Sequence, residues 1–241
     1  MRQAGRIAAE VLEELKKKVK VGITTKDLDK VAEELIRLKG AEPVFIGYRG
    51  YRHATCLSVN NEVVHGIPSE RTLKDGDIIS IDVGVKFDGY CGDTAATYPV
   101  GKVSSKVLKL LRVGKEALVA AIRQARWGNH LGDISYAIQR TAEKNGYSVV
   151  RDLYGHGLGR DLHEDPLVPN FGKAGEGPEL KPGMVLAIEP MINMGGSKVK
   201  TLSDGWTVVT EDGSLSCHFE HTVLITERDP EILTILGKGH G

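Results

Sequence analysis

LKDGDIISID at residues 73–82 and LKPGMVLAIE at residues 180–189 are two stretches of the chain with one pattern. Four of the ten positions are identical, and the offset between the two stretches is 107 residues. Each stretch runs from a turn containing glycine into an apolar segment that ends on an acidic residue, Asp82 in the first and Glu189 in the second. Such a match indicates that one structural unit occurs twice in the chain.

The same relation extends upstream of both stretches. GITTKDL, which begins at Gly22, aligns with GNHLGDI, which begins at Gly128, at an offset of 106 residues. We therefore expect an internal repeat, with halves at about 1–100 and 104–226, inside a single catalytic domain that covers residues 1–241. Two halves of one plan imply a pseudo-twofold axis, and sites form naturally where the halves meet.

Hydrophobic periodicity predicts the same order of elements in each half. Apolar residues recur at helical spacing in two pairs of segments, so we predict helices at 2–19, 25–39, 104–126 and 132–145. Thr25 is the expected cap of the second helix. Alternation typical of strands covers about 44–100 and returns in the second half, which predicts further strands at 184–194, 206–210 and 216–226. We expect loops through the Gly- and Pro-rich segment 155–183.

Charge and cysteine content exclude several classes of protein. Lys plus Arg and Asp plus Glu both number 32, so the net charge is zero. Because nucleic acids and membrane surfaces attract a positive excess, we expect neither as a partner. No apolar run reaches the length of a signal peptide or membrane helix. Three separated cysteines without a CxxC pair fit a reducing compartment, so we expect a cytoplasmic protein without a zinc-finger extension at the N-terminus.

Asp82 and Asp93 are the first pair of acidic residues that the pattern brings together. They occupy the two strands of a predicted hairpin whose turn contains Asp88 and Gly89. Residue 82 then lies opposite 93–95, and both carboxylates point from one face, directly or diagonally across. Like charges among apolar residues are costly unless a cation or a proton neutralises them. The alternative is that one of the two is a cap at the surface of the hairpin.

Glu189 and Glu220 supply the corresponding pair in the second half. Glu189 aligns with Asp82 through the repeat, and Glu220 lies in HFEHTVLIT, a predicted last strand. An isolated glutamate of this kind usually faces solvent, but the repeat brings both pairs to the shared axis. Four carboxylates around one point suit divalent metals, with oxygens that bridge two ions.

Three histidines next to glycine-containing segments complete the set of candidate residues. His156 has a glycine on either side, which allows close backbone approach. His65 and His163 lie in VVHGIP and DLHEDP. A lone histidine is more often structural than functional, but four candidate carboxylates in the same chain favour the functional interpretation. His218 shares a strand face with Glu220. We expect it to lie next to the metal ligands at most, without binding the metal itself.

These residues and their surrounding motifs closely resemble the type I methionine aminopeptidases. The matching segments are SVNNEVVHGIP, DGDIISIDVGVKFDGYCGDTAATYPVG, GHGLGRDLHEDPLVPN, KPGMVLAIEP and FEHTVLIT. The resemblance covers nearly the whole chain. It implies the pita-bread fold, an α/β fold of the α+β type with two pseudo-symmetric halves whose antiparallel sheets are covered by helices. It also implies removal of N-terminal methionine from nascent proteins and peptides.

The resemblance further assigns roles to individual residues. It implies that five residues hold two divalent ions (Co, Mn, Fe or Zn), namely Asp82, Asp93, His156, Glu189 and Glu220. Catalytic roles fall on His65, His163 and Glu189, and both histidines also contact the substrate. A methionine pocket is implied at Tyr48, Tyr51, Cys56 and Trp206, all of which also suit a plain core. The pocket departs from some family members at Leu162 and at Arg49. We expect a monomer, and a transient ribosome contact is compatible with the resemblance.

Other functions remain open from sequence. A proline-specific aminopeptidase or prolidase shares the ligand set, but those relatives usually carry a large N-terminal domain. A non-catalytic binding module with this fold is expected to lose ligands, whereas all five are present here. A two-carboxylate glycosidase has no use for His156 in its glycine setting.

Overall fold

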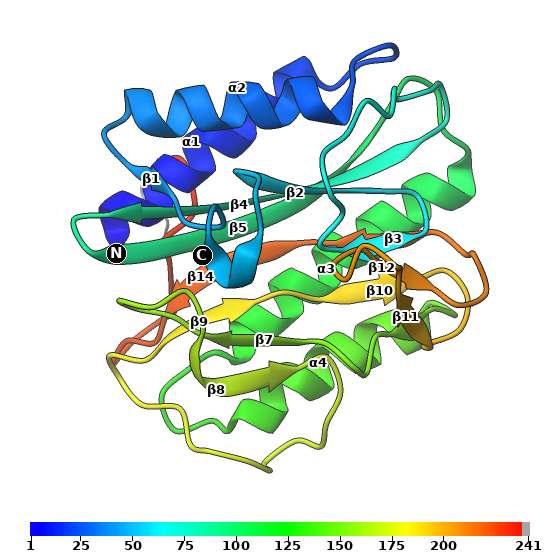
Figure 1. The fold of residues 1–241 in the computed structure, drawn as a ribbon. Coiled ribbons are helices and arrows are strands. Elements are labelled where there is room, and N and C mark those ends of the chain that lie inside the picture. The colour runs from blue at the N-terminus through cyan, green and yellow to red at the C-terminus, as the bar shows by residue number, and fades with distance from the viewer. Residues whose placement is uncertain (238–241) are drawn as a thin grey trace.

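The computed structural model describes residues 1–237, which form one curved antiparallel sheet, two small sheets and four α-helices (Figure 1). The helices are α1 (Arg2–Lys18), α2 (Thr25–Leu38), α3 (Ser105–Gln124) and α4 (Leu131–Lys144). The strands are β1 (Glu42–Pro43), β2 (Thr55–Val59), β3 (Glu62–Val64), β4 (Ile78–Phe87), β5 (Tyr90–Pro99), β6 (Ser148–Val149), β7 (Tyr154–Gly157), β8 (Glu164–Pro169), β9 (Val185–Ile188), β10 (Met191–Asn193), β11 (Val199–Thr201), β12 (Val208–Thr210), β13 (Ser216–His218), β14 (Glu220–Leu224) and β15 (Glu231–Ile232).

All four predicted helices are present, with ends within two residues of the predicted ones. The cap of α2 differs from the prediction, because Thr24 rather than Thr25 is the capping residue. The Thr24 hydroxyl accepts a hydrogen bond from the Asp27 backbone N–H at 3.0 Å, and the Asp27 carboxylate accepts one from the Thr24 N–H at 3.3 Å. This reciprocal capping box satisfies two backbone donors that the first helical turn leaves free.

The large sheet joins the two halves of the chain at its centre. Its main order is β1-β4-β5-β14-β9-β7-β8, with β2 paired to β4 and β15 paired to β14, and the pairs are antiparallel. The first half supplies β5 and the second supplies β14, whose residues Glu220 and His221 pair with Ala95 and Thr94. The central pair of strands is therefore a contact between residues more than 120 positions apart.

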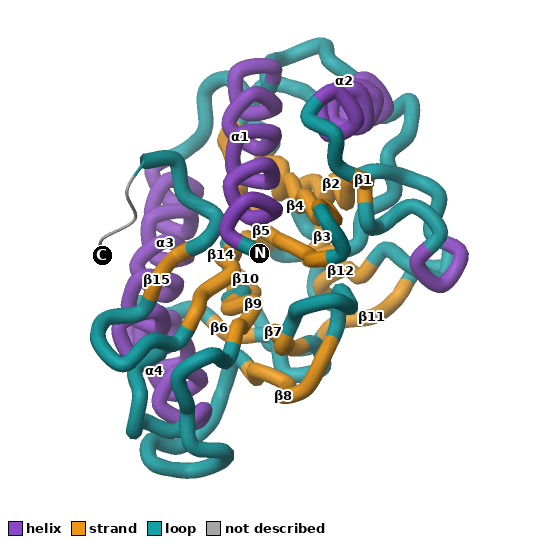
Figure 2. Tube along the Cα trace, turned by 90° about the vertical axis from the view of Figure 1, so that its left-hand side faces the viewer, coloured by secondary structure: helices purple, strands orange, loops and turns teal. Residues whose placement is uncertain are grey.

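Helices cover the outer side of this sheet in two pairs (Figure 2). One buried cluster joins α1 and α2 to β2, β4 and β5, with Leu15, Leu28 and Ile81 among its fully buried members. A second cluster joins α3 and α4 to β9 and β14. No helix among the described residues is long and apolar enough to cross a membrane. Each half has two helices followed by strands, which agrees with the internal repeat expected from the sequence. A common origin of the two halves by duplication stays a proposal.

The predicted strands of the second half are interrupted in the structure. The segment 184–194 contains β9 and β10, separated at Glu189, and 216–226 contains β13 and β14, separated at Phe219. The expectation of loops through 155–183 was wrong in part, because β7 and β8 pair within it. Strand β7 is short and half of its residues are glycine, so its sequence lacks the β-branched residues that mark a strand.

Helix α1 lies directly against the strand that carries Asp93. An added Cβ at Gly92 would lie 2.5 Å from the backbone nitrogen of Gly5, and one at Gly5 would lie 2.5 Å from the Leu233 carbonyl oxygen. Both distances are far below van der Waals contact, and both nearby atoms belong to the backbone. The absence of a side chain at Gly92 therefore sets how closely α1 approaches β5, and its absence at Gly5 sets how closely α1 approaches Leu233.

Gly92→Ala should lower the free energy of unfolding by about 1–3 kcal/mol, because the added methyl group must push α1 from the sheet. Gly196→Ala is the matched control, since its added Cβ would meet only the Asp212 carboxylate at 3.5 Å. Urea denaturation of both variants measures the difference. Equal stability of Gly92→Ala and the parent protein would show that α1 is not held at this distance by close packing.

Candidate metal centre

A cavity of about 340 Å³ opens where the two halves meet, over the junction of β5 and β14. It contains every residue that the sequence singled out for metal binding, catalysis or the methionine pocket. Its lining consists of Phe45, Tyr48, Arg49, Tyr51, Cys56, His65, Asp82, Asp93, His156, Leu162, His163, Leu167, Glu189, Trp206 and Glu220. Segments from positions 45 to 220 therefore converge on one site.

Asp82 and Asp93 lie diagonally across the β4–β5 hairpin. Asp82 pairs with Ala95, and Asp93 pairs with Gly84. Because alternate residues share a face, the pairing puts both carboxylates on the side that faces the cavity. The sequence-based expectation of a direct or diagonal arrangement is confirmed by this register.

Glu220 stands beside Asp93 because threonine hydroxyls bind the two strands together. The Thr222 hydroxyl accepts a hydrogen bond from the Asp93 N–H at 3.0 Å and donates one to the Asp93 carbonyl oxygen at 2.7 Å. The Thr94 hydroxyl donates to the carbonyl oxygen of Glu220 at 2.9 Å. These buried contacts fix the backbone of both acidic residues relative to each other, so their separation does not depend on a flexible loop.

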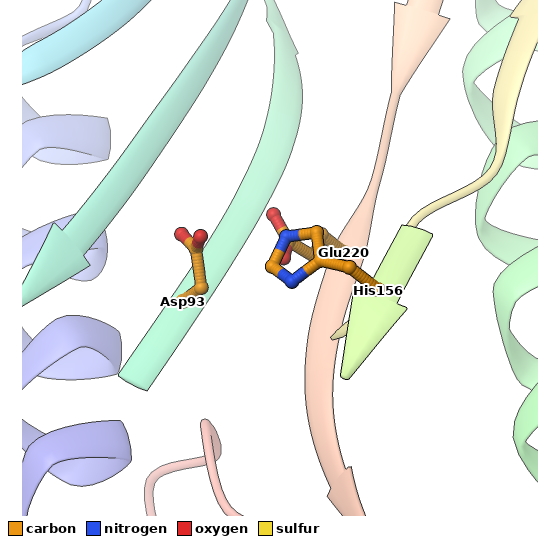
Figure 3. A group of neighbouring side chains, drawn as sticks. All are labelled: Asp93, His156 and Glu220. Carbon is orange, nitrogen blue, oxygen red and sulfur yellow. The ribbon is translucent and has the colours of Figure 1, made fainter. Parts of the chain in front are cut away.

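His156 approaches the carboxylates from β7, as Figure 3 shows. Its Nδ1 lies 2.9 Å from the carbonyl oxygen of Gly157, and a carbonyl only accepts, so Nδ1 carries the proton. The Nε2 lone pair is then free to face the cavity, the tautomer that a metal-binding histidine uses. The added Cβ of an alanine at Gly155 would lie 2.3 Å from the carbonyl oxygen of Ala187, which explains why glycine precedes this histidine.

Burial dominates the electrostatics of the acidic residues. It raises the pKa of Glu189 to about 8 and that of Asp93 to about 6. It also raises the pKa of Asp82 and of Glu220 well above the usual carboxyl range, with Asp93 as the next cause in both cases. Without a cation, the group therefore retains protons at neutral pH.

The donor set fits a divalent metal. Asp82 Oδ1, Asp93 Oδ1 and Glu220 Oε1 are buried and have no hydrogen-bond partner among residues 1–237. One ligand atom each from Asp93, His156 and Glu220 lies within 4.8 Å of the others. Buried oxygens without partners cost free energy, and a cation that several carboxylates share removes that cost. Oxygen ligands with one imidazole suit first-row divalent ions.

Glu189 follows directly after β9 and is close to two imidazoles. Its Oε1 lies 3.5 Å from His156 Nε2, and its Oε2 lies 3.3 Å from His218 Nε2. His218 is buried, and burial lowers its pKa to about 4, so its imidazole is neutral at physiological pH. The sequence analysis placed His218 outside the direct ligands but did not foresee this approach to Glu189.

His163 and His65 both line the cavity beside the cluster. The His163 ring is 4.1 Å from the His156 ring and 5.0 Å from the Tyr48 ring, measured between centroids. His65 lies at the end of β3 with a left-handed φ of 58° and faces Trp206 at 6.4 Å. Burial lowers the pKa of His65 to about 4, so this imidazole is also neutral at physiological pH.

An apolar pocket adjoins the carboxylates. Tyr51 packs edge-on against Trp206 at 4.9 Å, and its hydroxyl donates a hydrogen bond to the Thr55 carbonyl oxygen at 2.9 Å. The Tyr51 hydroxyl is therefore engaged by the backbone, and the rings, the Cys56 thiol and Leu162 line the pocket. Phe45 and Leu167 also line it, and the sequence analysis missed both. Phe45 follows the two-residue strand β1, and Leu167 lies in β8, where loops were expected, so no periodic pattern identified either residue.

Comparison with known proteins agrees with this geometry. The sequence model of metallopeptidase family M24 matches residues 1–227. Methionine aminopeptidase 1 from Bacillus subtilis is 57% identical over 97% of this chain and 94% of its own length. The methionine aminopeptidase of Clostridium perfringens is 55% identical over 98% of this chain and 95% of its own length.

Solved structures show the same fold. The crystal structure of methionine aminopeptidase from Thermotoga maritima matches with a TM-score of 0.96 and 48% identity, over 98% of this chain and 95% of that one. Prolidase from Pyrococcus furiosus, at 23% identity, matches with a TM-score of 0.79 over 98% of this chain and 63% of that one. The prolidase comparison concerns the fold alone.

A pita-bread fold with a buried carboxylate and imidazole cluster at the seam of its halves defines a metal-dependent peptidase. The chain belongs to metallopeptidase family M24, within the methionine aminopeptidases.

Removal of divalent ions with EDTA should make the stability of the protein fall as pH rises from 6 to 8. In the folded state Glu189 keeps its proton up to about pH 8, whereas the unfolded chain releases it near 4.5. Between these values the folded state binds more protons, so the free energy of unfolding declines with rising pH. We expect Tm to fall by roughly 3 °C per pH unit.

Differential scanning fluorimetry of the EDTA-treated protein at several pH values measures this slope. Glu189→Gln is the control, because a neutral amide removes one proton-binding group and should make the slope less steep, while Asp82 and Glu220 keep their contribution. A Tm that stays constant or increases between pH 6 and 8 in the metal-free parent would contradict the assignment of raised pKa values.

Proposed function

We propose that the chain removes the N-terminal methionine from nascent proteins and peptides as a metal-dependent methionyl aminopeptidase. The observation that carries this proposal is the 57% identity to an enzyme of that name over nearly the full length of both chains. The cavity supports it, because it joins a cation-binding cluster to an apolar pocket. All five residues that the family resemblance implies as metal ligands are present in the chain.

The proposed metal ligands are the five residues inferred from the sequence. Asp93 and Glu220, fixed side by side through Thr222 and Thr94, would hold two divalent ions from the junction of the halves. Asp82, His156 and Glu189 would supply the other protein ligands. Co, Mn, Fe and Zn all accept these ligands, so availability in the cell selects the ion. Bound divalent ions would supply positive charge that lowers the pKa of water towards neutrality and polarises the scissile carbonyl.

The side chains then divide the proton transfers of the reaction. Glu189 takes a proton from the attacking water as the new C–O bond forms. It passes this proton to the leaving amine as the C–N bond breaks. His163, beside His156 at 4.1 Å, donates a hydrogen bond to the oxyanion that develops on the carbonyl. His65, which also lines the cavity, helps to place the amino end of the substrate.

The methionine side chain would occupy the pocket formed by Tyr48, Tyr51, Cys56 and Trp206. A thioether packs favourably against aromatic rings, and the Tyr51–Trp206 pair offers two of them at a fixed angle of 64°. Buried Leu162 narrows this pocket with a branched apolar side chain. A long unbranched side chain fits such a space better than a charged one does.

Glu189→Gln and His156→Ala should each lower kcat by about 10²–10⁴-fold on a methionyl peptide while the protein stays folded. The first variant loses the proton acceptor, and the second loses a metal ligand. Peptide cleavage with metal analysis and circular dichroism measures the outcome. Glu227→Gln and His130→Ala are the controls, because neither residue lines the cavity. Near-normal turnover of the metal-loaded variants would refute the assigned roles.

Met-Gly-Met-Met should be cleaved about a hundredfold faster than an X-Pro dipeptide, because apolar and aromatic residues line the pocket beside the cluster. The alternative inferred from sequence is a proline-specific enzyme, and it predicts the reverse order. The comparison is made as kcat/KM with the metal-stripped protein reloaded with Co, Mn, Fe or Zn in turn. A preference for X-Pro with every ion would overturn the proposed specificity.

Three further features belong to the proposal. We expect the enzyme to act in the cytoplasm, as a monomer, and in transient contact with the ribosome from which its substrates emerge. The zero net charge of the chain supports binding without nucleic-acid specificity.

A further inference from the structure

Arg49 lies at the mouth of the catalytic cavity. Most residues that line the cavity are buried or half-buried, and the exposed ones are Arg49, His163 and Leu167. Leu167 is 57% exposed. These three residues therefore mark the opening through which a bound peptide must leave. A peptide whose first residue fills the apolar pocket passes this opening with its second and third residues.

The backbone holds Arg49 in a fixed and unusual conformation. Its φ of 48° and ψ of 28° are left-handed, which a residue with a long side chain adopts only when the surroundings impose it. Hydrogen bonds close the turn on both sides, from Gly47 N–H to the Tyr51 carbonyl and from Tyr51 N–H to the Tyr48 carbonyl. Strained backbone of this kind gathers at functional sites.

Aromatic contacts direct the side chain towards the reacting residues. The Arg49 guanidinium carbon lies 5.4 Å from the centre of the Tyr48 ring, within the range of a cation–π contact. Tyr48 in turn contacts His163 at 5.0 Å. A positive charge therefore stands one ring away from the histidine that is proposed to bind the oxyanion.

No carboxylate neutralises Arg49 within residues 1–237. None of the ion pairs in this part of the chain includes it. The side chain lies over the Tyr48 ring, and the residue is exposed at the opening of the cavity. An arginine held in this way is suited to bind a planar carboxylate of a ligand.

We propose that Arg49 forms a carboxylate-binding subsite that favours substrates with an acidic side chain at the third residue. This inference rests on the proposed function and names the class of peptide that the enzyme prefers. The α-amine of a substrate is placed beside the cluster, and the positive charge of Arg49 disfavours the amine at the mouth. The peptide therefore extends from the cluster to the mouth, at about 3.3–3.6 Å per residue, and we place its third residue at Arg49.

Three peptides that differ at one position test the subsite. Met-Gly-Glu-Met should have a kcat/KM about threefold higher than Met-Gly-Gln-Met, which should exceed Met-Gly-Lys-Met by a similar factor. The differences should lie in KM, because the contact is made equally before and during the reaction. They should shrink in 0.5 M salt, which screens exposed charges. Equal kcat/KM values for the three peptides at low salt would overturn the proposal.

Variants separate Arg49 from the general charge of the surface. Arg49→Gln should bring the Glu-to-Lys ratio close to one, and Arg49→Lys should retain part of it. Arg52→Gln is the matched control, because Arg52 is exposed nearby but does not line the cavity. This control should leave the ratio unchanged. A ratio that persists in Arg49→Gln, or that disappears in Arg52→Gln, would contradict the role of Arg49.

Binding measurements distinguish failure of this subsite from failure of the proposed function. Calorimetry with the reduced-amide analogues of the three peptides reports affinity without cleavage. A Glu-over-Lys preference in Kd that Arg49→Gln removes supports the subsite even if none of the peptides is cleaved. Cleavage of all three peptides with equal Kd values for the analogues leaves the aminopeptidase activity intact and refutes the subsite.

Discussion

The structure depends on one electrostatic constraint. Several carboxylates must be buried side by side although like charges repel one another. Asp82, Asp93, Glu189 and Glu220 face one cavity, and burial raises the pKa of each. Such a cluster contributes nothing to folding by itself, since unpaired buried oxygens are unfavourable. The rest of the chain must hold it, and two separate apolar clusters under the helix pairs supply that stability.

The scaffold meets this constraint where the two halves touch. Strands β5 and β14 come from different halves, and the hydroxyls of Thr94 and Thr222 bind the backbone of Glu220 and of Asp93 across the junction. Neither half contains a complete cluster. Pairing of β5 with β14 therefore also assembles the site. Helix α1 packs against Gly92, so packing within the first half affects the position of the strand that carries Asp93.

The sequence predicted those features that depend on local pattern. Helix ends, the β4–β5 hairpin and the diagonal placement of Asp82 and Asp93 follow from periodicity and turn chemistry, and they were confirmed. Strand β7 was missed because its glycines serve close approach, of Gly155 to Ala187 and of Gly157 to Asp165, rather than strand propensity. The approach of His218 to Glu189 was missed because it depends on the break at Phe219, where a single extended strand had been expected. Contacts set by three-dimensional packing have no period to detect.

The electrostatic potential changes from the floor of the cavity to its mouth, and the residue types alone do not predict this direction. Carboxylates form its floor, neutral imidazoles of His65 and His218 lie beside them, and the unpaired cation of Arg49 stands at the mouth. A substrate with an acidic side chain at its third residue brings a negative charge to this cation, whereas a basic side chain there is repelled. Burial of methionine then supplies affinity, and the charge at the mouth discriminates among peptides.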